Sequence, residues 1–238
     1  MGFETILVGR RDDGICVLTL SRPEKRNAIS LLMRQEILAC LHDWETSPGV
    51  RAVILCGAGG TFSAGFDLKE FQQHDRAQEV FESSAAYHRA VWKFPKPVIA
   101  AIQGHALGGG LDLAVLCDVR ICSDAAVFGH PEIKFGAPPL FTPLRWIIGD
   151  GRARDLCLTG RKITAQEAYR IGLVSEVVSE DLLMERALAI GTSIVQAPAE
   201  TVEYTKGFFT GNTDKGFEES FQIEHDRAFR DFLLKRRT

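Results

Sequence analysis

The segment VIAAIQGHALGGGLDLAVLC, residues 98–117, carries the pattern that decides the fold. Residues 98–102 form a short apolar run typical of a buried strand, and residues 104–110 form a glycine-rich loop. Residues 111–117 are apolar nearly all round except at Asp112, which predicts a short buried helix. We therefore expect a strand, a glycine loop and a helix in succession.

A second unit of this kind lies upstream. Residues 51–56 predict a buried strand, residues 57–65 form another glycine-rich loop, and the polar segment 67–93 leans toward helix. Near the N-terminus, an Asp-Gly pair joins two β-rich runs at 3–10 and 15–21, which predicts a hairpin. Repeated alternation of strands and helices indicates an α/β fold class.

Further signals mark the ends of helices. Ser30 is expected to cap a helix that follows it, and Thr164 with Glu167 matches a capping box. Residues 173–178 predict a final strand. From residue 179 to residue 238 the pattern is helical throughout, so the C-terminal quarter is expected to be a helical appendage.

Length and composition favour a folded globular protein. A chain of 238 residues fits one large domain, with or without an appendage, because single cores stop growing near roughly 250–300 residues. Its 45% hydrophobic and 25% charged residues are typical of that class. A net charge of -3 lacks the basic character of nucleic-acid-binding proteins, so we expect no nucleic-acid partner.

Other features bear on the compartment. No apolar run approaches the roughly 20 residues that cross a bilayer, so we expect no membrane span. Residues 1–14 are charged and lack the apolar region of a secretory signal, which favours the cytoplasm. The cysteines lie in apolar segments without metal-site or redox-pair spacing, so buried free thiols are expected. They are Cys16, Cys40, Cys56, Cys117, Cys122 and Cys157.

Both glycine loops could bring main-chain N–H groups close to a ligand. The N–H groups at the start of a helix suit an oxygen that becomes negative, so two such loops facing one cleft would form an oxyanion hole. Taken alone, each loop could equally serve a turn or tight packing. The dinucleotide-binding order G-x-G-x-x-G is matched neither by residues 57–60 nor by residues 108–110.

Several motifs, taken together, resemble the signature segments of the enoyl-CoA hydratase/isomerase (crotonase) family. They are RPEKRNA at 22–28, TFSAGFDLK at 61–69 and GHALGGGLD at 104–112. The match continues through Cys117-Asp118 and through FGHPE at 128–132, and it covers nearly the whole chain in the right order.

The resemblance implies a particular organisation. It implies a crotonase-like spiral of repeated ββα units over residues 1–190, followed by a C-terminal helical region at 191–238. Relatives use this last region to form trimers, which can stack into hexamers. We therefore expect a homotrimer or hexamer.

Carried over residue by residue, the resemblance also implies an active site. The N–H groups of the oxyanion hole fall on Phe66 and Gly109, and the catalytic carboxylates fall on Asp112 and Glu132. The residues themselves support Asp112, because a lone carboxylate in apolar surroundings is unfavourable unless it is paired or used. Alternatively, Asp112 is simply an acidic residue favoured at a helix start. The assignment of a catalytic role to Glu132 depends on the resemblance alone.

The same comparison implies substrate contacts. The residues assigned to substrate binding are Arg26, Ala28, Ala64, Gly65, Asp67, Leu68, Lys69, Gly108 and Leu140, and those assigned to the CoA end are Phe232 and Lys235. The substrate would be an acyl-CoA, with coenzyme A as part of the substrate and with no metal or other cofactor.

The implied reaction is hydration of a 2-enoyl-CoA. Asp112 would activate water for attack at C3, and Glu132 would supply the proton at C2. Two departures leave alternatives open. Hydratases usually carry Glu where this chain has Asp112, and residues 136–143 replace a glycine-rich segment with a bulkier, stiffer one.

Other members of the family run different reactions on the same oxyanion hole. An enoyl-CoA isomerase would use Glu132 alone as its proton shuttle. A dienoyl-CoA isomerase would carry another acidic residue where this chain has Leu140. Thioester hydrolysis, decarboxylation and a non-catalytic acyl-CoA-binding role are the remaining alternatives.

Overall fold

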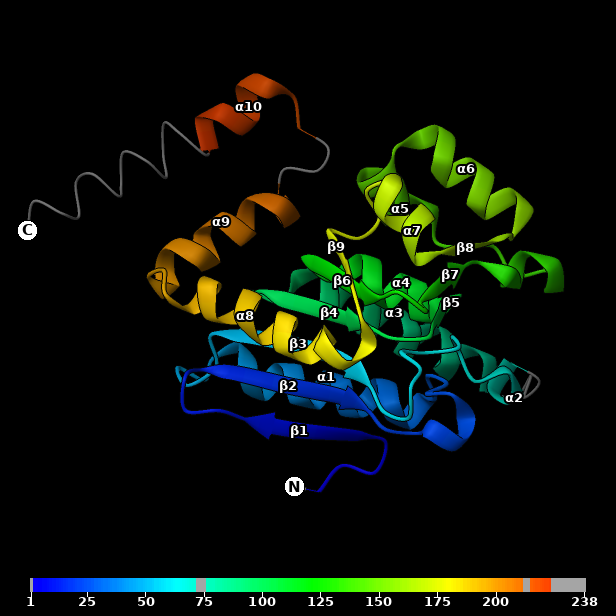
Figure 1. Ribbon diagram of the computed structural model, residues 1–238, viewed down its shortest axis with the longest axis horizontal. Helices are drawn as coiled ribbons and strands as arrows, with labels where there is room; N and C mark the ends of the chain where they lie inside the picture. The colour runs from blue at the N-terminus through cyan, green and yellow to red at the C-terminus, as the bar shows by residue number, and fades with distance from the viewer. Residues whose placement is uncertain (1, 72–75, 212–214, 224–238) are drawn as a thin grey trace, which may run out of the picture.

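A six-stranded sheet forms the centre of the structure, a computed structural model that describes residues 2–71, 76–211 and 215–223 (Figure 1). The predicted hairpin opens it, because β1 and β2 pair antiparallel, and the other neighbours are parallel. The order is β1-β2-β3-β4-β6-β9. Its strands are β1 (Ile6–Arg10), β2 (Ile15–Leu20), β3 (Ala52–Gly57), β4 (Val98–Ile102), β6 (Val119–Ser123) and β9 (Glu176–Val178).

A second, smaller sheet lies beside the first and positions the site. It consists of β5 (His105–Leu107), β7 (Val127–Gly129) and β8 (Lys162–Thr164), in the order β5-β7-β8. β5 and β7 run parallel with Leu107 opposite Gly129, so the two strands end side by side. The helix after β5 and the turn after β7 therefore begin at the same place.

Helices connect and cover these strands. Ser30 accepts a hydrogen bond from the Met33 N–H, and Thr164 accepts one from the Glu167 N–H, so both predicted caps are confirmed. The α-helices are α1 (Leu31–Glu45), α2 (Leu68–Phe71), α3 (Ala77–Lys93), α4 (Gly109–Leu116), α5 (Phe141–Ile148), α6 (Asp150–Thr159), α7 (Ala165–Arg170), α8 (Leu183–Val195), α9 (Ala199–Gly211) and α10 (Phe217–Phe221). Short 3₁₀ helices are η1 (Pro23–Lys25), η3 (Pro131–Phe135) and η4 (Glu180–Leu182).

The large sheet is covered on both faces. One face packs against α1, α3 and α4 in the main hydrophobic core, while α8 lies across the other face (Figure 1). On that second face Leu183 and Ala187 meet Ile15, Ile54 and Ile99. Burial on both faces explains why β3 and β4 are continuous apolar runs instead of alternating ones.

Most of the elements expected from the sequence are present in the structure. The α/β class, the hairpin and the helical C-terminal region are confirmed, and the described residues after 179 contain no strand. Two details were wrong: the loop predicted at 104–110 contains β5, and the final strand is shorter than 173–178. The expected boundary between residues 190 and 191 falls within α8, and the division at that point stays a prediction.

Other expectations can be compared directly. All six cysteines are buried and free, and burial raises the pKa of Cys40, Cys117 and Cys122 to about 12, which keeps these thiols protonated. Across residues 2–71, 76–211 and 215–223, no helix combines the length and apolar character needed to cross a bilayer.

The buried side chain of Lys206 links α9 to the large sheet through hydrogen bonds. Lys206 donates from Nζ to the Asp118 carboxylate and to the Lys96 carbonyl oxygen, each at 2.7 Å. The same Asp118 oxygen accepts the N–H of Val98, the first residue of β4. The ammonium group thus joins α9 to the point where β4 begins.

We expect Lys206→Met to lower the free energy of unfolding by about 3 kcal/mol, because it leaves Asp118 without its buried partner. Chemical denaturation measures this. The matched control is Arg10→Met, which breaks the exposed Arg10–Asp43 pair and should lower it by less than about 1 kcal/mol. Equal effects of the two substitutions would contradict the role given to Lys206.

Candidate active site

Four chain segments lie side by side at the predicted site, joined by main-chain hydrogen bonds. Ala64 N–H donates to Arg26 O at 2.9 Å, and Ile29 N–H donates to Gly65 O at 2.8 Å, so segments 26–29 and 63–66 are neighbours. Segment 63–66 is bonded in turn to β5, because Ser63 N–H donates to His105 O at 2.8 Å.

The fourth segment follows β7. Gly108 N–H donates to Gly129 O at 2.9 Å, which extends the pairing of β5 with β7 by one bond. The start of α4 and the 3₁₀ helix Pro131–Phe135 (η3) therefore leave the small sheet together. These main-chain hydrogen bonds bring the motifs at 22–28, 61–69, 104–112 and 128–132 together.

Two buried polar side chains hold the segments in register. Asn27, with a left-handed φ of 52°, donates from Nδ2 to Ala58 O and Thr61 O and accepts the Arg22 N–H. Ser63 donates from Oγ to Asn27 O at 2.8 Å and accepts the Gly65 N–H at 3.2 Å. These side chains satisfy main-chain groups that the turns leave unpaired.

The two residues predicted to form the oxyanion hole are adjacent. Gly109 is the first residue of α4, and the N–H at that position has no acceptor within its own helix. A Cβ built on Gly109 would lie 2.7 Å from Cδ2 of Phe66, and one on Gly65 would lie 3.4 Å from the Gly109 nitrogen. The Phe66 ring meets His88 edge-on and has the Arg34 guanidinium 5.3 Å from its centroid. Glycine at position 109 permits this contact.

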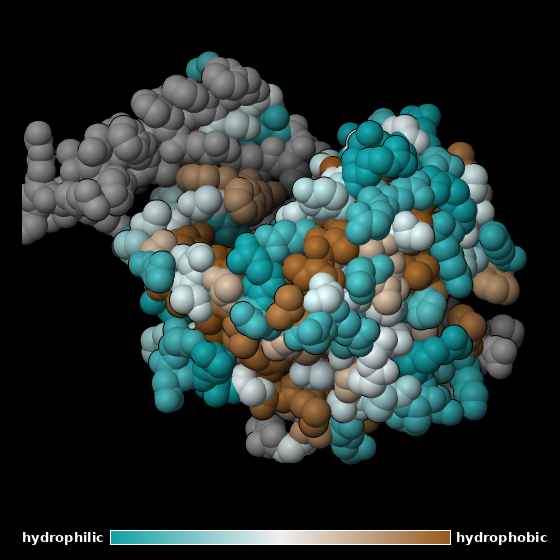
Figure 2. All heavy atoms as spheres, viewed as in Figure 1, coloured by the Kyte–Doolittle hydropathy of each residue, from teal (hydrophilic) through white to brown (hydrophobic). Residues whose placement is uncertain are grey.

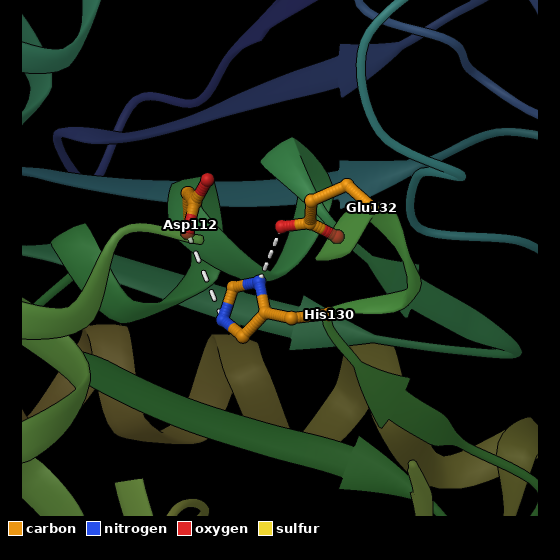
Figure 3. A group of neighbouring side chains, drawn as sticks. All are labelled: Asp112, His130 and Glu132. Atoms are coloured by element: carbon orange, nitrogen blue, oxygen red, sulfur yellow. Dashed lines mark hydrogen bonds and ion pairs between the residues drawn. The ribbon is translucent and has the colours of Figure 1, made fainter. Parts of the chain in front are cut away.

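The predicted carboxylates also come together, with a histidine between them (Figure 3). Asp112 lies in the first turn of α4, and Glu132 lies in η3. His130 Nδ1 is 2.8 Å from Glu132 Oε1, whereas His130 Nε2 is 3.8 Å from Asp112 Oδ1. Only the first distance is a hydrogen bond.

Burial shifts the acid–base properties of this group. Burial raises the pKa of Asp112 to about 7, against the opposing influence of His130, and the charge of Glu132 adds to the increase. For His130, burial opposes the charged form, but the hydrogen bond to Glu132 and the charges of both carboxylates leave its pKa raised. Asp112 can therefore change protonation near neutral pH, and His130 stays charged to higher pH than a free histidine.

Polar atoms remain without partners here. Among the described residues, Asp112 Oδ1, His130 Nε2 and Glu132 Oε2 are buried and make no hydrogen bond. Buried polar atoms of this kind are typically satisfied by a water molecule or a ligand. The three side chains offer ligand atoms within 4.8 Å of one another, so their spacing also suits a divalent ion, and the expected absence of a metal stays a prediction.

The chain is similar in sequence and in fold to members of one protein family. The model of the enoyl-CoA hydratase/isomerase family matches residues 10–235. The chain belongs to this family. A probable enoyl-CoA hydratase of Mycobacterium bovis is 39% identical over 209 residues, which are 87% of this chain and 81% of the relative. A probable enoyl-CoA hydratase of Rhizobium meliloti is 39% identical over 197 residues, 82% of this chain and 76% of the relative.

Solved structures of enoyl-CoA hydratases have the same fold as this chain. The crystal structure of an enoyl-CoA hydratase from Bacillus anthracis superposes with a TM-score of 0.91 and 33% identity, covering 97% of this chain and 92% of that one. The crotonase-like α/β fold with a helical C-terminal region is thereby confirmed. The assignment of individual residues to roles within that fold stays a prediction.

The other residues predicted to bind substrate differ in exposure and in contacts. Asp67 is committed to the fold, because it pairs with Arg22 at 3.1 Å and accepts the Lys69 N–H. Leu68 and Lys69 are exposed, while Leu140 is half-buried just before α5, which packs on α4. Arg26, Ala28, Ala64, Gly65 and Gly108 lie in the four neighbouring segments. Phe232 and Lys235 lie outside the described residues.

Sequence reasoning missed His130. It stood within a quoted motif, but no role was attached to it, because a single histidine after a strand has no distinctive spacing. The available signal was its position two residues before Glu132 at the end of a predicted motif.

We expect Ser63→Ala to lower the free energy of unfolding by about 1–3 kcal/mol, because Asn27 O and Gly65 N–H would lose a buried partner. Denaturation with circular dichroism measures the loss. Ser193→Ala, on the exposed side of α8, serves as the control and should change stability by less than about 0.5 kcal/mol. A Ser63 variant as stable as the control would show that this bond does not hold the segments together.

Proposed function

We propose that the protein adds water across the 2,3 double bond of a 2-enoyl-CoA thioester. One observation carries the proposal: carboxylates from α4 and η3 meet beside the adjoining Phe66 and Gly109, and each carboxylate and the histidine between them has a buried polar atom that makes no hydrogen bond within the described residues. Such a site suits a water molecule next to a thioester. Membership of the family supports the same class of substrate.

The chemistry follows from these positions. The N–H groups of Phe66 and Gly109 would hold the thioester oxygen, where the helix start favours the negative charge of the enolate more than the neutral carbonyl. One carboxylate takes a proton from water as its oxygen bonds to C3. The electrons of the double bond move to the thioester oxygen and return to form a C–H bond at C2 with the proton of the other carboxyl group.

The remaining expectations belong to this proposal. Arg26, Ala28, Ala64, Gly65, Asp67, Leu68, Lys69, Gly108 and Leu140 would line the path of the acyl-CoA, and no cofactor beyond CoA itself would be needed. We also propose a cytoplasmic homotrimer or hexamer. Leu7 on β1 and Leu182 before α8 are exposed apolar side chains that association would cover. Figure 2 shows apolar side chains among polar ones on the face in view.

The direct test follows the loss of conjugated enoyl absorbance when crotonyl-CoA is added. We expect Asp112→Asn and Glu132→Gln each to lower kcat by at least about 100-fold, because each removes an acid–base group. The controls are Asp124→Asn and Glu24→Gln, which make the same changes at exposed sites and should leave kcat unchanged.

The same variants separate the alternatives. Conversion of a 3-enoyl-CoA that survives Asp112→Asn and is lost with Glu132→Gln would identify an isomerase with a single proton shuttle. Binding of crotonyl-CoA without turnover, unaffected by either substitution, would leave a non-catalytic acyl-CoA-binding protein and remove hydration.

We expect Gly109→Ala to lower kcat/KM for crotonyl-CoA by about 100-fold or more. The added Cβ would press on the Phe66 ring from 2.7 Å and displace one of the two proposed N–H donors. Gly151→Ala is the control, because nothing lies within 4 Å of a Cβ there. Full activity of the Gly109 variant would argue against the proposed oxyanion hole.

A further inference from the structure

A fully buried arginine, Arg34 on α1, lies beside Phe66, which is proposed to supply one of the two N–H donors. Its guanidinium carbon is 5.3 Å from the centroid of the Phe66 ring. The same ring meets His88 of α3 edge-on, and a Cβ built on Gly109 would lie 2.7 Å from it. Contacts from α1, α3 and the start of α4 therefore fix the ring.

The guanidinium also reaches the main chain next to Phe66. Arg34 donates from Nη1 to Ile29 O at 3.2 Å. The same carbonyl oxygen accepts the Asp67 N–H at 3.2 Å, while the Ile29 N–H donates to Gly65 O at 2.8 Å. Ile29 is thus bonded to the residues on both sides of Phe66, and Arg34 shares one of these two bonds. It supports the backbone at position 66 as well as the ring.

The other two guanidinium nitrogens bond to helices on either side of the segment 72–75. Nη2 donates to Oε2 of Glu70 in α2 at 3.1 Å, and Nε donates to Oγ of Ser83 in α3 at 3.0 Å. The second oxygen of Glu70 accepts the Leu31 N–H at the start of α1 at 2.6 Å. Because each guanidinium nitrogen has a partner, Arg34 is held in one position, and it joins α1, α2 and α3 around Phe66.

Stability alone does not account for a charged pair at this place. Burial lowers the pKa of Arg34, an effect that the charge of Glu70 opposes. Apolar residues of similar size in place of a buried ion pair are often neutral or stabilising. What the pair adds is direction, because a planar guanidinium bonds to its partners in a fixed geometry.

Direction matters at Phe66 more than at Gly109. The Gly109 N–H belongs to the first residue of a helix, which fixes where it points. Phe66 lies in the connection between β3 and α2, directly after Gly65, whose φ is 101°. Glycine is the least restricted residue type, so neighbouring groups must supply the rigidity here. Misplacement of a catalytic group by about 1 Å can cost about 100-fold in rate.

We propose that Arg34 is a positioning residue for the oxyanion hole, and that its bonds to Ile29 O and its contact with the Phe66 ring direct the Phe66 N–H at the thioester oxygen. Since Arg34 is fully buried, it acts through Phe66 and not on the substrate. This inference rests on the proposed function, because it concerns the oxyanion hole that hydration would use.

Bound acetoacetyl-CoA reports on the oxyanion hole without turnover. This β-keto thioester loses a proton from C2 to solvent, and the electron pair spreads onto its two carbonyl oxygens to give an enolate with a near-ultraviolet absorbance of its own. N–H donors at the thioester oxygen favour the enolate, so the pH midpoint of its formation measures their effect. We expect Arg34→Met to raise the midpoint of the bound ligand by about 1–2 pH units, a roughly 10- to 100-fold loss of enolate stabilisation.

Kinetics with crotonyl-CoA should agree. Arg34→Met should lower kcat by about 10- to 100-fold and change KM by less than about threefold, because the donor acts on the enolate more than on the bound substrate. Arg34→Lys keeps the charge but not the planar fork, and should recover only part of the loss. Glu70→Gln keeps an acceptor for the Leu31 N–H but holds Arg34 less firmly, so a smaller change in the same direction is expected.

Lys206→Met is the matched control, because it also removes a buried cation from an ion pair, here with Asp118. It should lower stability to denaturant and leave both the midpoint and kcat unchanged. Gly109→Ala is the positive reference, since it displaces the other proposed donor and should raise the same midpoint. Circular dichroism establishes that each variant is folded under the assay conditions.

The outcomes separate this proposal from the proposed function. An Arg34→Met protein that is less stable but has an unchanged midpoint and kcat would show that the arginine supports only the fold, which overturns the proposal while hydration stands. A chain that does not hydrate crotonyl-CoA, yet binds acetoacetyl-CoA as an enolate whose midpoint Arg34→Met raises, keeps this role and loses the reaction. If Arg34→Met does not fold, Glu70→Gln decides: a raised midpoint supports the proposal, and an unchanged one overturns it.

Discussion

Close contact between the backbone of segment 63–66 and the start of α4 is the constraint on which the site depends. A Cβ on Gly110 would lie 2.5 Å from Ser63 O, and one on Gly65 would lie 2.8 Å from Leu107 O. These distances are too short for any side chain, so glycine is required on both sides of the contact. This contact brings Phe66 against Gly109. β5, which leads to Gly109, pairs with β7, and the chain after β7 carries Glu132.

The cluster of Asp112, His130 and Glu132 beside this contact lowers stability, because buried polar atoms in it make no hydrogen bond to any described residue. Apolar residues of similar size would bury well at positions 112 and 130, whereas the side chains present leave polar atoms unsatisfied. By contrast, Asn27 and Ser63 are equally buried but make their hydrogen bonds within the fold. Two sets of buried polar residues thus lie next to each other, one bonded within the fold and one with polar atoms left unsatisfied.

Local signals explain which features were predictable from sequence. The caps at Ser30 and Thr164, the Asp-Gly hairpin and the apolar runs of β3 and β4 depend on neighbouring residues, so they could be predicted. The strands β5, β7 and β8 have three residues each and owe their existence to pairing with distant strands. The carboxylates came from the family resemblance, and His130 was missed because its importance depends on two partners that only tertiary structure brings near.

The length of the side chain at position 112 determines whether its carboxylate can bond to His130. The gap between 3.8 Å and hydrogen-bonding distance is about 1 Å, close to the reach that one further methylene would add. A glutamate at this position could extend to Nε2, and the imidazole would then bond both carboxylates alike. The shorter side chain keeps Asp112 out of hydrogen-bonding reach of His130, so the imidazole is bonded to Glu132 and not to Asp112. On this argument Asp in place of Glu keeps a carboxylate at this position of α4 and changes its contact with His130.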